Sequence, residues 1–283
     1  MKKRILGILL TLCIVICLAP TGVFADGETV KNVATAQELI DALADGANGT
    51  VRLAADIDIA GSLNIFRTVT LDLNGHVLKM TGSGSVIILD DNSGTNTGDL
   101  TLVDSDPTAE HKFKVNGAEP WTPDDNGTEV VCGGIITGGT GTRIFNSNFA
   151  EGGGVNVGNG VFTMTGGNIV GCTAYYGGGV NLINGSFTMN GGSIVGCSSI
   201  ARNESGEPFY SGIYAFAEYG SSGTFTMTGG VIKNAGRQGV SLIHGITLYA
   251  CGGEIYDQVD VSSDCAITYR DGLTDVTDFK GAV

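Results

Sequence analysis

Aromatic and polar side chains gather in four short segments of this sequence, between residues 137 and 238. The segments read TGGTGTRIFNSNFAE from Thr137, TAYY from Thr173, SSIARNESGEPFYS from Ser198 and AGRQ from Ala235. Aromatic faces can stack on sugar rings, and exposed Tyr and Arg are common anchors of protein interfaces. We therefore predict a surface that binds an extracellular glycan or a host or cell-surface protein. Its residues are Arg143, Phe145, Phe149, Tyr175, Tyr176, Arg202, Phe209, Tyr210 and Arg237.

Acidic and histidine residues do not form a recognisable catalytic set. The acidic pair at residues 90–91 ends a predicted strand, and the pair at 124–125 lies in a polar insertion with no basic partner in sequence, so both are interpreted as turn residues. The histidines, His76, His111 and His244, lack the spacing that zinc requires and are expected at the surface. No G-x-S-x-G, P-loop or dinucleotide fingerprint is present. No catalytic residue is predicted, and a non-enzymatic protein is favoured over an enzyme.

Metal and cysteine chemistry is equally sparse. Asp56, Asp58 and Asp72 alternate with apolar residues, so they are expected to face outward on strands. Weak calcium binding by such carboxylates is the one cofactor interaction considered; no other cofactor and no metal site are predicted. Cys172 and Cys197 lie one repeat apart and are expected to stack as buried thiols without a disulfide.

The four segments interrupt a sequence repeat. GGGVNVGNGVFTMTGGNIVGC from Gly152 is followed by GGGVNLINGSFTMNGGSIVGC from Gly177, and weaker copies begin at Gly212 and Gly239. A period of 20 to 50 residues is typical of a solenoid. Each copy has three short pieces with alternating apolar residues, separated by Asn-Gly or Gly-Gly, as in strands with one buried face. The pattern predicts an all-β fold, a right-handed parallel β-helix with three strands per coil.

Stacking of the coils predicts three columns of buried side chains, because equivalent residues of neighbouring coils lie ~4.8 Å apart. The first column is Phe162, Phe187, Phe225 and Leu248; the second is Met164, Met189, Met227 and Ala250; the third is Ile136, Ile169, Ile194, Ile232 and Ile255. The aromatic segments all follow the Ile-containing strand, so they should share one corner. The alternative is that their rings fold back over the coil as small satellite clusters.

The N-terminal residues predict export and a cap. Residues 1–25 read MKKRILGILLTLCIVICLAPTGVFA, a signal peptide expected to be cleaved near Ala25, which implies a secreted or cell-surface bacterial protein. Residues 26–49 are predicted as a capping segment with a helix. Thr35 and Glu38 would form its capping box, Leu39, Ile40 and Leu43 its buried face, and Gly46 its stop. Residues 50–283 would form the β-helix with its loop insertions.

The charge and the hydropathy exclude several partners. The net charge is −14, so nucleic acid and anionic membranes would be repelled. The apolar run of the signal peptide is too short for a confident membrane span, so no span is expected in the mature chain.

Two motifs carry a resemblance to known proteins. GGGV, together with FTMN at residues 187–190, resembles the GG-aliphatic and F-x-x-N repeats of polymorphic membrane protein adhesins. The leading helix and the LDLNGH segment from Leu71 resemble secreted and cell-surface β-helix proteins of the pectate-lyase-like superfamily. The resemblance covers most of residues 30–256 and implies the parallel β-helix fold. Enzymes of that superfamily cleave acidic polysaccharides.

These observations lead to one main hypothesis and two alternatives. The main hypothesis is a non-enzymatic extracellular or cell-surface β-helix that serves adhesion, or glycan or partner binding, through its aromatic corner loops. The first alternative is a polysaccharide lyase or glycoside hydrolase that acts on an extracellular polysaccharide. The second is an ice-binding solenoid, based on the outward residues Thr163, Thr165, Thr188, Thr226 and Thr228.

Overall fold

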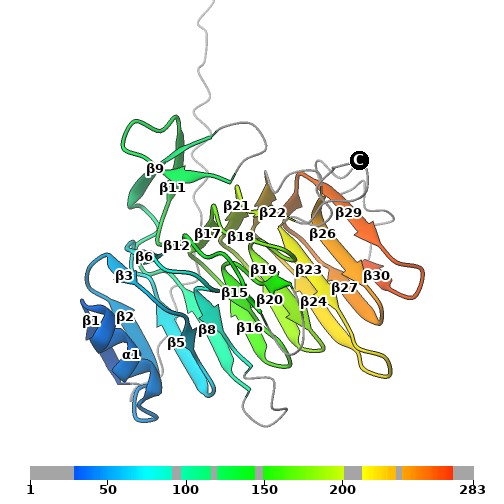
Figure 1. Cartoon of the computed structure of the whole chain (residues 1–283), viewed down its shortest axis with the longest axis horizontal. Coiled ribbons are helices and arrows are strands. Elements are labelled where there is room, and N and C mark those ends of the chain that lie inside the picture. The colour runs from blue at the N-terminus through cyan, green and yellow to red at the C-terminus, as the bar shows by residue number, and fades with distance from the viewer. Residues whose placement is uncertain are drawn as a thin grey trace, which may run out of the picture.

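The chain forms a tower of stacked coils (Figure 1). The structure is a computed structural model, which describes residues 29–90, 97–115, 120–143, 149–200, 212–233 and 238–269. Within these residues, each full coil contributes one strand to each of three parallel sheets, and one short helix lies at the N-terminal end. The predicted all-β parallel β-helix is confirmed.

The three sheets run the length of the tower. Sheet 1 contains β1 (Val30–Val33), β2 (Thr50–Leu53), β5 (Thr68–Asp72), β8 (Asp99–Val103), β16 (Val161–Met164), β20 (Ser186–Met189), β24 (Gly223–Met227), β27 (Ile246–Ala250) and β30 (Ala266–Tyr269). Sheet 2 contains β3 (Ile57–Ile59), β6 (Val77–Met80), β12 (Ile135–Thr137), β17 (Asn168–Val170), β21 (Ser193–Val195), β25 (Val231–Lys233) and β28 (Glu254–Ile255). Sheet 3 contains β4 (Leu63–Asn64), β7 (Ile87–Ile88), β15 (Val155–Asn156), β19 (Val180–Ile183), β23 (Ile213–Phe216), β26 (Gln238–Ile243) and β29 (Gln258–Val261).

The core consists of the predicted side-chain columns. Phe162 pairs with Phe187 and Phe187 with Phe225, and their rings stack with centroids 5.0 Å apart in both steps. Leu248 extends this column. The Met column lies in the same strands, and the Ile column runs through sheet 2 in register. Every member of the three columns is fully buried, so all three are confirmed.

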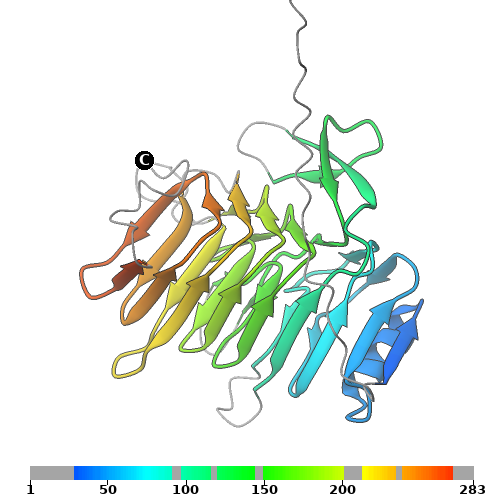
Figure 2. The same cartoon turned by 180° about the vertical axis from the view of Figure 1, so that it is seen from behind.

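Helix α1 (Ala36–Ala44) covers the N-terminal end of the tower, as Figure 2 shows from behind. The Thr35 hydroxyl accepts the Glu38 N–H, as the capping box predicts, while the Glu38 carboxylate accepts the Ala34 N–H. One predicted core residue is wrong: Ile40 is 47% exposed, and Ala42 occupies the buried face instead. A helix in this position closes an end that would otherwise expose unpaired strand edges.

Gly46 directly follows the C-cap residue Asp45, where the helix stop was predicted, but it does not adopt the positive φ of a glycine cap. The helix ends at Ala44, and Arg67 from the next coil reaches its last carbonyls. The Arg67 guanidinium donates to the carbonyl oxygens of Leu43 at 2.6 Å and Ala42 at 3.1 Å. A cation that satisfies the free carbonyls of a helix end makes a glycine cap unnecessary.

A small three-stranded antiparallel sheet, which we call the hairpin, projects from the tower between sheets 1 and 2. It consists of β9 (Glu110–Lys114), β10 (Thr122–Pro123) and β11 (Glu129–Cys132). Two further two-stranded pairs are β13 (Thr142–Arg143) with β14 (Ala150–Glu151), and β18 (Thr173–Ala174) with β22 (Ser198–Ser199). Among the described residues, no helix has the length and apolarity to cross a membrane.

Candidate binding site

The predicted binding residues divide between described and undescribed parts of the chain. Arg143, Phe149, Tyr175 and Tyr176 lie in the described residues. Phe145, Arg202, Phe209, Tyr210 and Arg237 lie outside them. Arg143 is exposed in β13, where it pairs with Ala150. The described part of the predicted shared corner leads from β14 to β19.

Three of the predicted rings meet at this corner. Phe149 stacks on Tyr175 with ring centroids 4.1 Å apart. Tyr176 meets Phe149 at 5.5 Å and Tyr175 at 4.8 Å, both edge to face. Offset stacking and edge-to-face contacts are the favoured arrangements of aromatic pairs. The three residues form one cluster although Phe149 precedes the other two by a full coil.

The cluster continues onto the outer face of sheet 3. Tyr176 stacks on Tyr214 of β23 at 4.8 Å, and Tyr214 lies 6.5 Å from Phe216 with nearly parallel planes. Phe149 is 38% exposed, and the other four side chains are partly exposed. We call Phe149, Tyr175, Tyr176, Tyr214 and Phe216 the aromatic flank.

The sequence prediction missed Tyr214 and Phe216 because they belong to a strand and not to a loop. In β23 the alternating residues Ile213 and Ala215 are fully buried, which turns Tyr214 and Phe216 outward. Tyr214 occupies the register position held by Asn181 in the preceding coil. Alignment of GGVNLI with SGIYAF would have placed a ring at that position.

A buried polar layer lies on the same outer face of sheet 3. The Asn181 amide donates to Glu151 Oε2 at 3.2 Å and to Asn156 Oδ1 at 3.4 Å. Asn181 Oδ1 and Ser241 Oγ are buried without a hydrogen-bond partner, and both residues neighbour Tyr214 in the sheet register. Unsatisfied buried polar atoms are uncommon. Both side chains are fully buried, so a ligand at the surface does not contact them.

The ionisation of Tyr176 suits hydrogen bonding. Burial raises the pKa of the Tyr176 phenol, and the neighbouring Tyr175 and Glu151 raise it further. The phenol therefore remains protonated at neutral pH and can both donate and accept. The aromatic flank thus combines ring faces with polar groups, which is the chemistry that sugar recognition uses.

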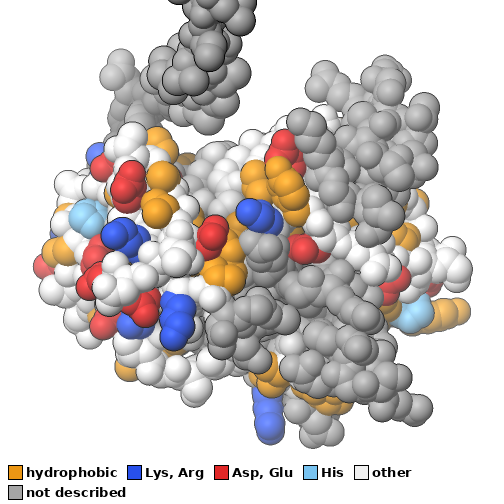
Figure 3. All heavy atoms as spheres, turned by 90° about the horizontal axis from the view of Figure 1, so that it is seen from above, with side chains coloured by type: hydrophobic (Ala, Val, Ile, Leu, Met, Phe, Trp, Pro, Cys, Tyr) orange, Lys and Arg blue, Asp and Glu red, His pale blue; other side chains and the backbone are white. Residues whose placement is uncertain are grey.

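A hollow lies between the hairpin and sheet 2. It has a volume of about 720 Å³ and is lined by Asp56, Asp58, Val77, Lys79, Glu110, His111, Lys112, Phe113, Pro123, Asp124 and Asp125. Figure 3, seen from above, shows acidic and basic side chains interspersed on this side of the molecule, whereas hydrophobic side chains gather nearer the middle. We call it the hairpin groove.

Several polar groups of the hairpin groove already serve the backbone. Asp56 accepts the Val77 N–H at 2.9 Å. Asp124 accepts the Asn126 N–H at 2.8 Å, which supports the interpretation of this acidic pair as turn residues. His111 Nε2 lies 2.9 Å from the Gly75 carbonyl oxygen. The hairpin groove contains both carboxylates and lysines, which are the residue types that a polysaccharide-cleaving site would need.

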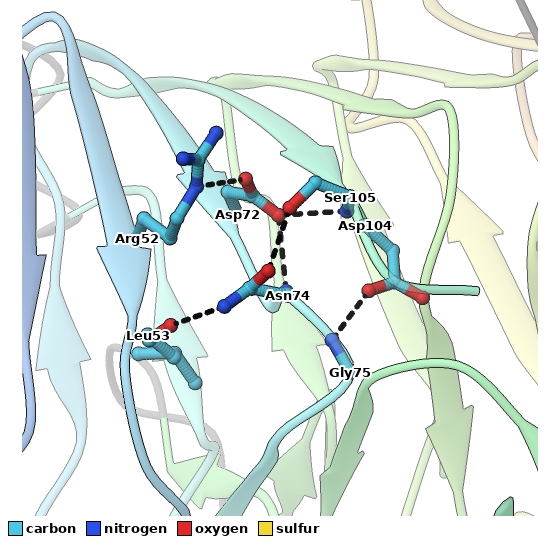
Figure 4. A network of polar contacts seen from close by, with 7 residues as sticks. All are labelled: Arg52, Leu53, Asp72, Asn74, Gly75, Asp104 and Ser105. Carbon is cyan, nitrogen blue, oxygen red and sulfur yellow. Dashed lines mark hydrogen bonds and ion pairs between the residues drawn. The ribbon is translucent and has the colours of Figure 1, made fainter. Parts of the chain in front are cut away.

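The base of the hairpin contains a carboxylate network that corrects one prediction. Asp72 does not face solvent: it is fully buried and pairs with Arg52 at 2.7 Å, as Figure 4 shows. It also accepts the N–H groups of Asn74 and Ser105. Alternation still places Asp72 opposite the core residues Leu71 and Leu73, beside Arg52. It is buried because the strand ends there, and the carboxylate accepts backbone N–H groups of the turn that need acceptors.

Asp104 has the same role one coil later. It accepts the N–H of Gly75 at 2.8 Å and that of Gly134 at 2.7 Å (Figure 4). Burial raises the pKa of Asp104 despite these hydrogen bonds. The LDLNGH segment is thus a structural corner in which carboxylates hold the turn.

The remaining candidate groups are the predicted calcium ligands, the buried cysteines and the outward threonines. No group of three or more His, Cys, Asp or Glu side chains within the described residues could hold a metal ion. Cys172 and Cys197 are both buried and free. Thr163, Thr188 and Thr226 align in register on sheet 1, but the neighbouring column contains Val161, Ser186 and Thr224.

The fold and the exposed rings together define a parallel β-helix that carries an aromatic face on one side. The chain belongs to the family described as "Putative pectate lyase-like adhesive domain", which matches residues 30–191, more than half of its length. The family supports an adhesin-like, extracellular or cell-surface role. No curated protein and no solved structure shows a significant match to the chain.

Proposed function

We propose that this protein is an adhesive domain that holds an extracellular glycan on its aromatic flank. The observation that supports this most strongly is the continuous set of ring contacts from Phe149 through Tyr176 to Phe216. Rings that only packed a loop against the tower would be expected to be fully buried, and these are not. The net charge of −14 favours a neutral or cationic glycan over a polyanionic one.

The Tyr176 phenol supports a sugar in preference to an apolar ligand. It stays protonated, so it can donate a hydrogen bond to a glycan hydroxyl and accept one from it. Asn181 and Ser241, on either side of Tyr214, are fully buried and lie out of the reach of a surface ligand.

A glycan array tests the proposal. The wild type is compared with a variant that carries Tyr175→Ala, Tyr176→Ala and Tyr214→Ala, and with Tyr249→Ala as a control. Tyr249 is 40% exposed on sheet 1, away from the aromatic flank, so its removal should change nothing. We expect specific glycan binding by the wild type and the control and its loss in the triple variant. Equal profiles for all three proteins, or no binding by any, would remove the proposal.

Two alternatives have distinct outcomes in the same set of experiments. Shortened oligosaccharides, detected by mass spectrometry after incubation with the protein, would favour a polysaccharide-cleaving enzyme. Attachment to cells that persists after enzymatic removal of their surface glycans, and that the triple variant lacks, would favour a protein partner on the aromatic flank.

A further inference from the structure

The corners between sheets 3 and 1 differ in length, and one of them overhangs its neighbour. Two residues, Asn184 and Gly185, join β19 to β20, and His244 and Gly245 join β26 to β27 in the same way. The corner between them in the stack, from β23 to β24, has six residues, 217–222. The extra residues extend this corner beyond the adjacent coil.

The tip of the longer corner carries an unsupported aromatic ring. Tyr219 has a relative exposure of 107%, the highest among the exposed large hydrophobic side chains described. The next residue, Gly220, has φ +85° and no atom close to the position of a Cβ. Exposing a whole tyrosine ring gains nothing in folding free energy, since burial is what stabilises an aromatic side chain. The fold therefore does not account for this ring.

A hollow lies between the longer corner and the two coils that follow. Its volume is about 510 Å³, within the range of sites for small ligands. It is lined by Phe216, Ala217, Glu218, Tyr219, Gly220, Ser221, His244, Gly245 and Asp264. Phe216 ends β23 and the other residues belong to corners of three successive coils, so the hollow exists only because the coils stack. We call it the corner pocket.

The polar groups of the corner pocket are held in place. His244 Nδ1 lies 2.8 Å from Asp264 Oδ2, and this hydrogen bond lowers the pKa of Asp264. The Glu218 N–H donates to Asn184 Oδ1 at 2.7 Å, which fixes the start of the longer corner. The Phe216 ring meets the His244 ring edge to face at 5.7 Å.

The charge of the corner pocket selects the ligand. It contains two carboxylates, Glu218 and Asp264, and neither Lys nor Arg. An anion would be repelled, whereas a cation would be attracted by both carboxylates and by the face of an aromatic ring. A metal ion is not the fitting cation, because no group of potential ligands among the described residues is close enough to hold one. An organic cation remains.

We propose that the corner pocket binds a sugar residue that carries a protonated amine. The amine would lie against Glu218 and Asp264, the sugar ring would stack on Tyr219, and Ser221 and the free Nε2 of His244 would bond its hydroxyls. This site goes beyond the proposed function, because it lies at a different corner of the coil and uses different residues from the predicted binding loops. Phe216 is the one residue that the corner pocket shares with the aromatic flank.

A catalytic interpretation of the same residues is less well supported. Ser221, His244 and Asp264 are the residue types of a nucleophilic triad. Within the described residues, however, no hydrogen bond joins the Ser221 hydroxyl to His244, and the side chains of His244 and Asp264 are 60% and 52% exposed. The histidine is therefore assigned to binding.

Two matched oligosaccharides test the amine. Binding of the glucosamine tetramer and of the N-acetylglucosamine tetramer is measured by calorimetry at 0.15 M salt, where long-range attraction to the acidic protein is screened. The two ligands share a backbone and differ in the charged amine. We expect the glucosamine tetramer to bind at least tenfold more tightly. Equal affinities, or no binding of the glucosamine tetramer at millimolar concentration, would overturn the proposal.

Three variants test the location. Tyr219→Ala and Asp264→Asn should each weaken binding of the glucosamine tetramer by about tenfold, and Glu218→Gln by several-fold. Tyr249→Ala and the pair Tyr175→Ala with Tyr176→Ala should leave it unchanged, so the corner pocket and the aromatic flank can fail separately. Tyr219 has a relative exposure of 107%, so its removal should leave the variant folded. Unchanged binding by Tyr219→Ala and Asp264→Asn would show nonspecific attraction and overturn the proposal.

Discussion

The hairpin and the aromatic flank are two places where aromatic side chains lie outside the central columns. In the hairpin, Phe113 and Trp121 are 1% and 5% exposed and pack with Val170 and Val195 on the outer face of sheet 2. On the aromatic flank, Phe149 is 38% exposed and its four partners are partly exposed. The same residue types therefore anchor an insertion in one region and remain accessible in the other.

The hairpin and the aromatic flank differ in the coil residues that lie next to their aromatic rings. The Trp121 ring lies directly over Gly196, where a Cβ would come within 2.1 Å of the indole. Apolar Val170 and Val195 flank that position, so the indole fills a dry site. On the aromatic flank, Asn156 and Asn181 of sheet 3 and Glu151 of β14 lie beside Tyr176 and Tyr214. A ring above polar groups is suited to a ligand that also hydrogen-bonds.

The largest expected effect comes from removing the hairpin anchor. Trp121→Ala should destabilise hairpin docking by about 3–5 kcal/mol, since a buried indole and its packing are lost. Limited proteolysis should then cut within residues 105–132 while the coils stay protected. Glycan binding by the aromatic flank should not change, because the hairpin covers a different sheet.

Tyr249→Ala is the matched control for this change, since an exposed ring should contribute less than about 0.5 kcal/mol. A Trp121→Ala protein whose hairpin stays as resistant to protease as the wild type would contradict the anchoring role. Loss of glycan binding in the same variant would show that the two regions are not independent.

The carboxylate network at the base of the hairpin should have the next largest effect. Asp72→Ala leaves the Asn74 and Ser105 N–H groups without their acceptor and Arg52 without its partner. We expect a loss of about 3 kcal/mol in the free energy of unfolding, measured by urea denaturation. The exposed Asp58→Ala is the control. Equal unfolding midpoints for wild type and Asp72→Ala would refute the structural role.

Single substitutions on the aromatic flank should have a smaller effect. They should lower the affinity for the glycan and leave the free energy of unfolding unchanged. Tyr176→Ala and Tyr214→Ala should each weaken the glycan found on the array by about tenfold, or ~1.4 kcal/mol. Tyr214→Phe keeps the ring and should retain most of the affinity. If Tyr214→Phe bound as poorly as Tyr214→Ala, ring stacking would not be the source of the affinity.

The smallest effect concerns pH at the corner held by Asp104. Because burial raises the pKa of Asp104 above its ordinary value of 3.8, the folded state binds this proton more tightly than the unfolded state. The resulting stability is complete below about pH 3.8 and is lost as the pH rises through the folded-state pKa. The difference in urea midpoint between wild type and Asp104→Asn should therefore fall as the pH rises from 3.5. A difference that rises with pH would mean that the backbone N–H groups outweigh burial.

The sequence predicted the tower well because its core repeats. Phe187, Met189 and Ile194 each have equivalents one coil away, so the strand register followed directly from the spacing. Features that occur once were harder to predict. The docking of Trp121 on Gly196 joins residues from different coils, and no repeat pairs them.

The binding site was predicted only where it lies in loops. Tyr175 and Tyr176 were identified from their insertion, and the structure brings them to Phe149 as a cluster. Tyr214 was missed because an aromatic residue at an outward strand position resembles ordinary strand composition. The burial of Asp72 could not be predicted, because alternation along a strand shows which way a side chain points and not what covers it.

A crystal structure of the protein with the oligosaccharide that binds best on the array shows directly whether the aromatic flank binds a glycan. We predict a pyranose ring stacked on Tyr176 or Tyr214, with a hydroxyl within hydrogen-bond distance of the Tyr176 phenol. An oligosaccharide bound only in the hairpin groove, with the aromatic flank empty, would contradict it.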